Sequence, residues 1–144
     1  MHLTRIAPIT LAFALVAGTT ALAQECVPGA PLTADQQARR KQGVQLTRTI
    51  NNLEANQPGS RTKTYLRHVE LPSSEFARRA TGGSAEMIGK MNFTPGQELM
   101  PGWQLTLDVT ADGYWFMIKD KTDPCGFAFI SNQNGLIFEA QPIR

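Results

Sequence analysis

Few residues of this chain have the types and spacing that catalysis needs. Apart from His2, near the N-terminus, the only histidine is His68, and no Gly-x-Ser-x-Gly elbow accompanies it. A zinc site would need several histidine or cysteine ligands at short spacing, and the two cysteines lie far apart in the sequence. The sequence therefore predicts no catalytic residue, cofactor or zinc centre, and we expect a non-enzymatic protein.

Acidic residues leave two alternatives open. The segment from Asp108 to Gly113 has the outline of a calcium loop. The loop template requires an acidic or amide residue where Thr110 stands and a glutamate where Lys119 stands, so a hairpin turn is expected. A small secreted hydrolase using carboxylates is the second alternative. Its candidate residues are Glu70, Glu75, Glu86 and Glu98.

The N-terminus has the three parts of a secretory signal. Met1 to Arg5 is a short positive start, Ile9 to Ala17 is an uncharged and mainly apolar run, and Ala21-Leu22-Ala23 supplies small residues for cleavage. We expect a signal peptide over residues 1–23 and one domain over residues 24–144. No second apolar run is long enough to span a membrane, so a periplasmic or secreted location is expected.

Both cysteines lie after the expected cleavage point. In an oxidising compartment two thiols in a secreted chain favour a disulfide over a metal site or a redox pair. We therefore predict a bridge between Cys26 and Cys125, which would attach the proline-containing N-terminal arm to the third strand of a C-terminal sheet.

The elements expected to carry these residues form an α+β fold. A capping box at Thr33 and Gln36 begins a helix over Ala34 to Asn56, and a short helix capped by Ser73 is expected to end at Gly82-Gly83. The stretch from Ser84 to Pro101 is expected to be a packed loop. About four strands then form an antiparallel meander packed on the long helix. They are expected over Trp103–Thr110, Tyr114–Lys119, Cys125–Ser131 and Leu136–Ala140.

The central strands are apolar on both sides, which requires cover on both faces of the sheet. The long helix can cover one face, and either the methionine-rich stretch from Met87 to Met100 or a partner molecule would cover the other. Aromatic residues on adjacent strands are usually core, but they also form platforms for sugars or peptides. The candidate interaction surface consists of Trp103, Tyr114, Trp115 and Met117.

Charge is distributed unevenly although the formal net charge is only +2. Basic residues are concentrated between Arg39 and Arg79, whereas the sheet half is acidic. The helix either complements its own sheet or binds an anionic partner such as a phospholipid head group or a cell-wall polymer. No nucleic acid is expected, because the chain is exported and its basic residues lack interleaved aromatics.

The expected layout is a helix, an irregular middle and a terminal meander. The meander contains the segments Gly113-Tyr114, Asp123-Pro124-Cys125-Gly126-Phe127 and Asn134-Gly135-Leu136-Ile137. In this layout and in these segments the chain resembles the globular half of type IV pilin-like and pseudopilin-like proteins. True pilins keep a long apolar assembly helix, whereas polar Gln24-Glu25 follows an ordinary signal here. The resemblance implies a pilin-like envelope module with a binding or structural role, and its partner would be another envelope or secreted protein. Major pseudopilins bind calcium near the C-terminal loops of the sheet, so the resemblance also leaves open a calcium site at Asp120 and Asp123, which lie in a comparable loop. A secreted inhibitor or ligand-binding module that uses the methionine-rich stretch is a further alternative.

Overall fold

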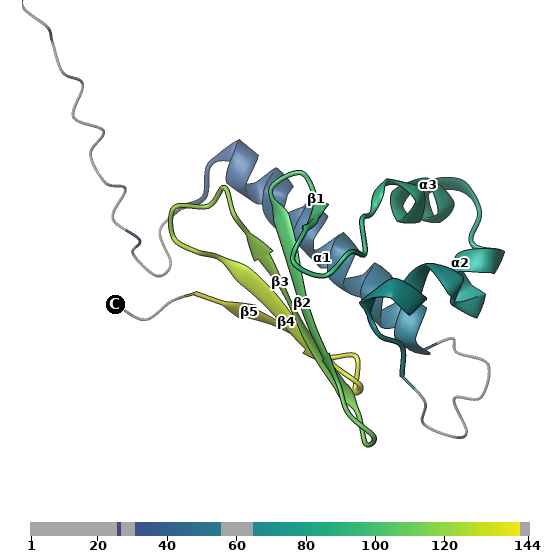
Figure 1. Ribbon diagram of the computed structural model, residues 1–144. Coiled ribbons are helices and arrows are strands. Elements are labelled where there is room, and N and C mark those ends of the chain that lie inside the picture. Colours follow the sequence, from purple (N-terminus) through teal and green to yellow (C-terminus); the bar gives the residue numbers. More distant parts are fainter. Residues whose placement is uncertain (1–25, 27–30, 56–64, 142–144) are drawn as a thin grey trace, which may run out of the picture.

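A computed structural model describes residue 26 and residues 31–55 and 65–141 (Figure 1). The expected signal peptide lies outside the described residues. Helix α1 spans Ala34–Ala55, and the predicted last residue, Asn56, lies outside the described residues. The predicted capping box is confirmed, because the Thr33 backbone N–H donates to Gln36 Oε1 at 2.9 Å and the Gln36 N–H donates to Thr33 Oγ1 at 3.2 Å.

The middle of the chain is more helical than its sequence indicated. It forms the 3₁₀ helix η2 (His68–Ser73), α2 (Glu75–Arg79) and α3 (Gly82–Lys90). The cap of α2 is Ser74 rather than Ser73, and its Oγ accepts the Ala77 N–H. The expectation that Gly82-Gly83 would end a helix was wrong, because α3 begins there, at a glycine with a left-handed φ of 57°. The expected loop from Ser84 therefore starts as a helix.

The sheet is an antiparallel meander of five strands, one more than expected, in the order β1-β2-β3-β4-β5. The additional strand is β1, which lies in the stretch expected to be a loop. The strands are β1 (Glu98–Met100), β2 (Trp103–Val109), β3 (Tyr114–Asp120), β4 (Ala128–Asn132) and β5 (Ile137–Ala140). The α+β class is confirmed.

Helix α1 lies across one face of this sheet, called the inner face below (Figure 1). The helix buries Leu46, Ile50 and Leu53 in the core, which is the stripe at helical spacing that the sequence contains. At Gly43 the helix approaches the sheet so closely that an added Cβ would lie 2.2 Å from Phe129 Cε2 and 2.8 Å from Trp103 Cη2. Glycine is therefore required at this crossing.

The disulfide between Cys26 and Cys125 is present, with a Cα–Cα distance of 5.4 Å. Cys125 lies in the turn between β3 and β4 rather than inside a strand, because β4 begins only at Ala128. The bridge therefore attaches the N-terminal arm to a turn of the sheet. In the described part of the chain no helix has both the length and the apolar character needed to cross a membrane.

Candidate functional site

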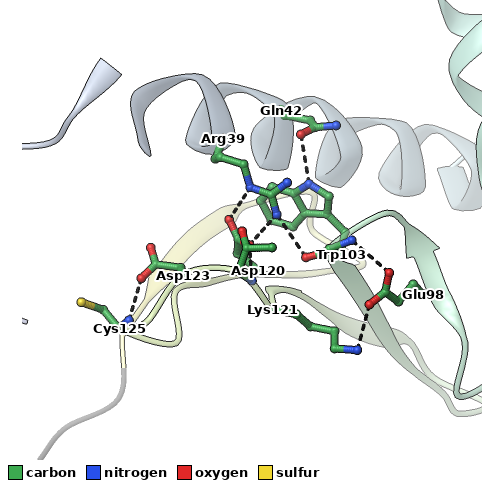
Figure 2. Close-up of polar contacts among 10 residues, drawn as sticks. Arg39, Gln42, Glu98, Trp103, Asp120, Lys121, Asp123 and Cys125 are labelled. Carbon is green, nitrogen blue, oxygen red and sulfur yellow. Dashed lines mark hydrogen bonds and ion pairs between the residues drawn. The ribbon is translucent and has the colours of Figure 1, made fainter. Parts of the chain in front are cut away.

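The clearest polar cluster joins α1 to the end of β3, and its centre is Asp120 (Figure 2). The Asp120 carboxylate is almost fully buried and accepts hydrogen bonds from the Arg39 guanidinium, from the Thr122 backbone N–H at 2.9 Å and from the Thr122 hydroxyl at 2.7 Å. Arg39 also lies over the Trp103 ring at 4.5 Å and donates to the Gly102 carbonyl at 3.1 Å. Every strong acceptor of the cluster therefore already has a donor.

The pKa of Asp120 agrees with an internal role for its carboxylate. Burial raises the pKa of Asp120, but the hydrogen bonds from Arg39 and Thr122 together outweigh burial and lower the pKa below its ordinary value. The carboxylate is thus ionised and neutralised by an internal cation. Such a buried pair fixes the crossing of α1 over the sheet rather than presenting a free acid or base.

The acidic side chains of the loop that was considered for calcium bind other groups of the domain. Asp120 faces Arg39, and Asp123 Oδ1 accepts the Cys125 backbone N–H at 2.7 Å (Figure 2). Among the described residues no group of three acidic, histidine or cysteine side chains is placed to hold a metal ion. The geometry gives calcium no preformed site at Asp120 and Asp123.

The glutamates considered for hydrolysis also have local partners. Glu75 pairs with Arg79, Glu86 with Lys90 and Glu98 with Lys121, while Glu70 Oε2 accepts the Arg67 backbone N–H at 2.7 Å. Three of these are ion pairs at the surface, and the Glu75–Arg79 and Glu86–Lys90 pairs have the one-turn helical spacing. Nothing in their contacts indicates a pair of carboxyl groups facing each other across a cleft.

Basic residues of α1 complement the sheet, as one interpretation of the charge distribution expected. Besides the Arg39–Asp120 pair, Arg40 lies over the Phe127 ring at 4.0 Å and its Nη1 is 3.5 Å from Glu139 Oε2. These two arginines therefore hold the helix on its own sheet.

The outer face of the sheet, opposite α1, carries an apolar stripe. Met117 is the register partner of Ile130, and Ile130 is the register partner of Phe138, so that these side chains form a row across β3, β4 and β5. Trp115 continues the row on β3 and is 43% exposed, and Phe138 is 53% exposed. We call Trp115, Met117, Ile130 and Phe138 the outer-face stripe.

The four residues of the candidate interaction surface are divided between the two faces. Trp103 and Tyr114 point inward and are buried in the core, so they do not belong to an exposed surface. Tyr114 is fixed there by its hydroxyl, which donates to Asn51 Oδ1 on α1 at 3.0 Å. Only Trp115 and Met117 lie on the outer face, because successive residues of a strand point to opposite sides.

Ile130 and Phe138 complete the stripe and were missing from the candidate surface. The alternation of side chains along each strand could have identified them, since both residues lie on the same face as Met117 once the strands are paired. The pairing register, rather than residue type, is thus the information that was needed.

Comparisons of the chain with protein-family models, with curated proteins and with solved structures gave no match. The arguments about function therefore rest on the geometry of this chain.

A second feature is a groove of about 420 Å³ along the free edge of β2. Its lining includes Arg67, His68, Val69, Pro95, Leu107 and Val109. Burial lowers the pKa of His68, and a hydrogen bond to the backbone of Leu105 opposes this shift. His68, the only histidine outside the expected leader, thus lies half-buried against the sheet edge.

Glu54, near the end of α1, has the most strongly shifted pKa of the carboxyl groups in the described part of the chain. It is 2% exposed, and its Oε2 accepts the Leu66 N–H at 3.0 Å, but its Oε1 has no hydrogen-bond partner among the residues described. Burial raises the pKa of Glu54 to about 7, the bond from Leu66 opposes the shift, and the nearby Glu70 adds to it. This buried acid of α1 lies near Tyr114 on the inner side of the sheet, not on the outer face.

Proposed function

We infer that this chain is an exported, pilin-like binding domain whose outer sheet face docks onto another protein of the cell envelope. The observation that carries the proposal is the outer-face stripe. Large apolar side chains without cover on a sheet face are typical of interaction sites. No helix or strand of the described residues covers them, whereas α1 packs on the inner face over β3 and β4 and buries the core there.

The shape of the face favours a protein over a small molecule. Small ligands are usually bound in deep, enclosed pockets, but the stripe lies on an open row of three strands. Its rim carries polar groups such as Asp108, whose Oδ2 accepts the Trp115 Nε1–H at 3.1 Å. An apolar centre, an anchoring tryptophan and a polar rim are the usual composition of a protein interface.

Two further observations support an envelope location. The Cys26–Cys125 disulfide is compatible with an extracytoplasmic compartment, and the helix-plus-meander layout is the one that a pilin-like resemblance implies. The sequence also begins with a signal-like leader. A periplasmic or secreted binding role unites these features.

Site-specific photo-crosslinking in cells of the native host tests this proposal. A benzophenone side chain replaces Phe138 in the full chain, and a matched variant carries it at Lys41, which is exposed on α1. We expect one dominant adduct with a different protein from position 138 and none of the same mass from position 41. Adding Trp115→Ala should weaken capture about tenfold, because a central tryptophan anchor is lost.

The alternative outcomes are distinguishable. An adduct of twice the mass of the chain would identify a second copy as the occupant and contradict the proposal. The same adduct from both positions would show collision without a specific surface, and no adduct from position 138 would remove the outer face as a docking site.

A further inference from the structure

Among the described residues, the β2 edge of the sheet is paired over only part of its length. Strand β1 pairs with β2 only through Glu98↔Gln104 and Met100↔Trp103, and the chain then leaves the edge (Figure 1). From Leu105 to Val109 no described strand pairs with this side of β2. Most sheet edges of this kind are covered, twisted away or occupied by another strand.

The hydrogen-bond pattern shows which backbone groups face the open side. The Lys121 N–H donates to the Gly102 carbonyl and the Thr110 N–H donates to the Gly113 carbonyl, both at 2.9 Å, so even-numbered residues of this segment bond toward β3. In an antiparallel pair the alternate residues then point their N–H and C=O groups the other way. Leu107 and Val109 therefore present backbone donors and acceptors that no described residue pairs.

The groove described above lies along these groups. One wall is β2 at Leu107 and Val109, and the other consists of the start of η2 and Pro95. His68 lines the groove beside Val69 and lies near the backbone of Leu105. Val69, which is 66% exposed, adds an apolar side chain beside the unpaired backbone.

We propose that this groove binds an extended peptide segment, which adds to the sheet as a strand alongside β2. Unpaired backbone groups at strand spacing are complementary to another extended backbone, and apolar wall residues accept alternate side chains. A second copy of the domain is disfavoured as occupant, because its β2 would bring its own η2 and Pro95 against the same groove wall. The partner is thus a flexible segment of another polypeptide, at a site separate from the outer-face stripe.

A matched pair of substitutions isolates the backbone contribution. Leu107→Pro removes the N–H that faces the groove without removing a bond to β3, whereas Leu107→Ala shortens the same side chain and keeps the N–H. Circular dichroism and urea unfolding confirm that both variants fold. A random twelve-residue peptide library, displayed on phage and panned against the disulfide-bonded wild-type domain with counter-selection on Leu107→Pro, supplies the probe.

We expect the recovered peptides to alternate apolar and polar residues and to bind Leu107→Ala within a few-fold of wild type. Leu107→Pro, or methylation of the peptide nitrogens that face β2, should each weaken binding by about tenfold. Trp115→Ala should leave the affinity unchanged, which separates this site from the outer face.

Three results would overturn the proposal: recovery of no peptide, equal binding by N-methylated peptides, or equal loss of binding in Leu107→Ala and Leu107→Pro. Concentration-dependent dimerisation that Leu107→Pro abolishes would assign the edge to a second copy instead. If Leu107→Pro does not fold, Val109→Pro with Val109→Ala provides the same comparison at the next outward-facing N–H.

Discussion

The two tryptophans of this chain lie on opposite faces of one sheet and differ in every contact. Trp103 is fully buried, lies under the Arg39 guanidinium and donates its Nε1–H to Gln42 Oε1 on α1 at 3.1 Å. Trp115 donates its Nε1–H to Asp108 on the neighbouring strand and leaves its ring exposed. The first ties the helix to the sheet, and the second is free to meet a partner.

The same contrast extends to the whole of each face. The inner face is complete, with Gly43 allowing close helix contact and the buried Arg39–Asp120 pair fixing the crossing. The outer face has apolar side chains in register but no cover from the described elements. We therefore expect the stability of the domain to depend mainly on the inner face, which leaves the outer face open to the proposed partner.

The sharpest test of the contrast uses two adjacent residues of β3. Phe116 is fully buried on the inner face, so Phe116→Ala should lower the free energy of unfolding by about 3–5 kcal/mol. Trp115→Ala, on the outer face, should cost about 1 kcal/mol or less. Urea unfolding followed by circular dichroism measures both. Similar losses for the two variants would contradict the assignment of the faces.

The disulfide provides the next largest effect. Its cysteines are 99 positions apart, and the chain entropy of so long a loop predicts that removing the bridge costs about 2–4 kcal/mol. The double variant Cys26→Ser/Cys125→Ser should therefore unfold at lower urea concentration. The wild-type protein in reductant is the control and should match it. If both unfold like the oxidised protein, the N-terminal arm contributes nothing to the fold.

Burial of Glu54 should make the stability of the domain depend on pH. Its pKa is raised to about 7 by burial, so the folded state keeps a proton that the unfolded state releases, and stability falls as the pH rises from about 4.5 to about 7. Glu54→Gln should remove this decline and be more stable than wild type by about 2–3 kcal/mol at pH 8, with little difference at pH 4.

Thermal unfolding across that pH range measures the effect. Glu86→Gln is the control, because Glu86 is an exposed carboxyl paired with Lys90 and its pKa is lowered rather than raised. A wild-type stability that is flat between pH 4 and pH 8 would show that Glu54 is not buried as described.

Substitution of Gly43 should change the stability of the domain by a smaller amount. Gly43→Ala should destabilise by about 1–2 kcal/mol, because the added methyl group would overlap the buried rings of Phe129 and Trp103 by more than the helix-propensity gain of alanine can offset. Gly89→Ala on α3, where an added Cβ meets nothing within 4 Å, should instead stabilise by a few tenths of a kcal/mol. Opposite signs in differential scanning calorimetry are expected, and a stabilised Gly43→Ala would refute the close contact.

Much of the fold could be predicted because local signals agreed with the final packing. The capping box at Thr33 located the start of α1, and Asp112-Gly113 and Asn134-Gly135 located turns between strands. Helix α3 and strand β1 were missed. A glycine pair usually ends a helix, but Gly82 adopts the left-handed conformation at the start of α3, and its neighbours then continue as a helix.

The candidate surface could be predicted only in part, because both sides of β3 are apolar and sequence does not say which side α1 covers. Tyr114 and Trp115 are neighbours in a strand and must point to opposite faces, so one surface could not contain both. Trp103 has the parity of the inner face once β2 is paired with β3. Ile130 and Phe138 join Met117 only through the register of β4 and β5.

Hydroxyl-radical footprinting can detect a partner bound to the outer face, because tryptophan and methionine are readily oxidised when exposed. The rates of oxidation of Trp115 and Met117 would be measured by mass spectrometry in the purified protein and in the envelope fraction of native cells, with Met87 on α3 as the internal reference. We expect Trp115 and Met117 to be oxidised several-fold more slowly in the envelope fraction, while the rate for Met87 changes little. Unchanged rates for Trp115 and Met117 would contradict a bound partner on the outer face.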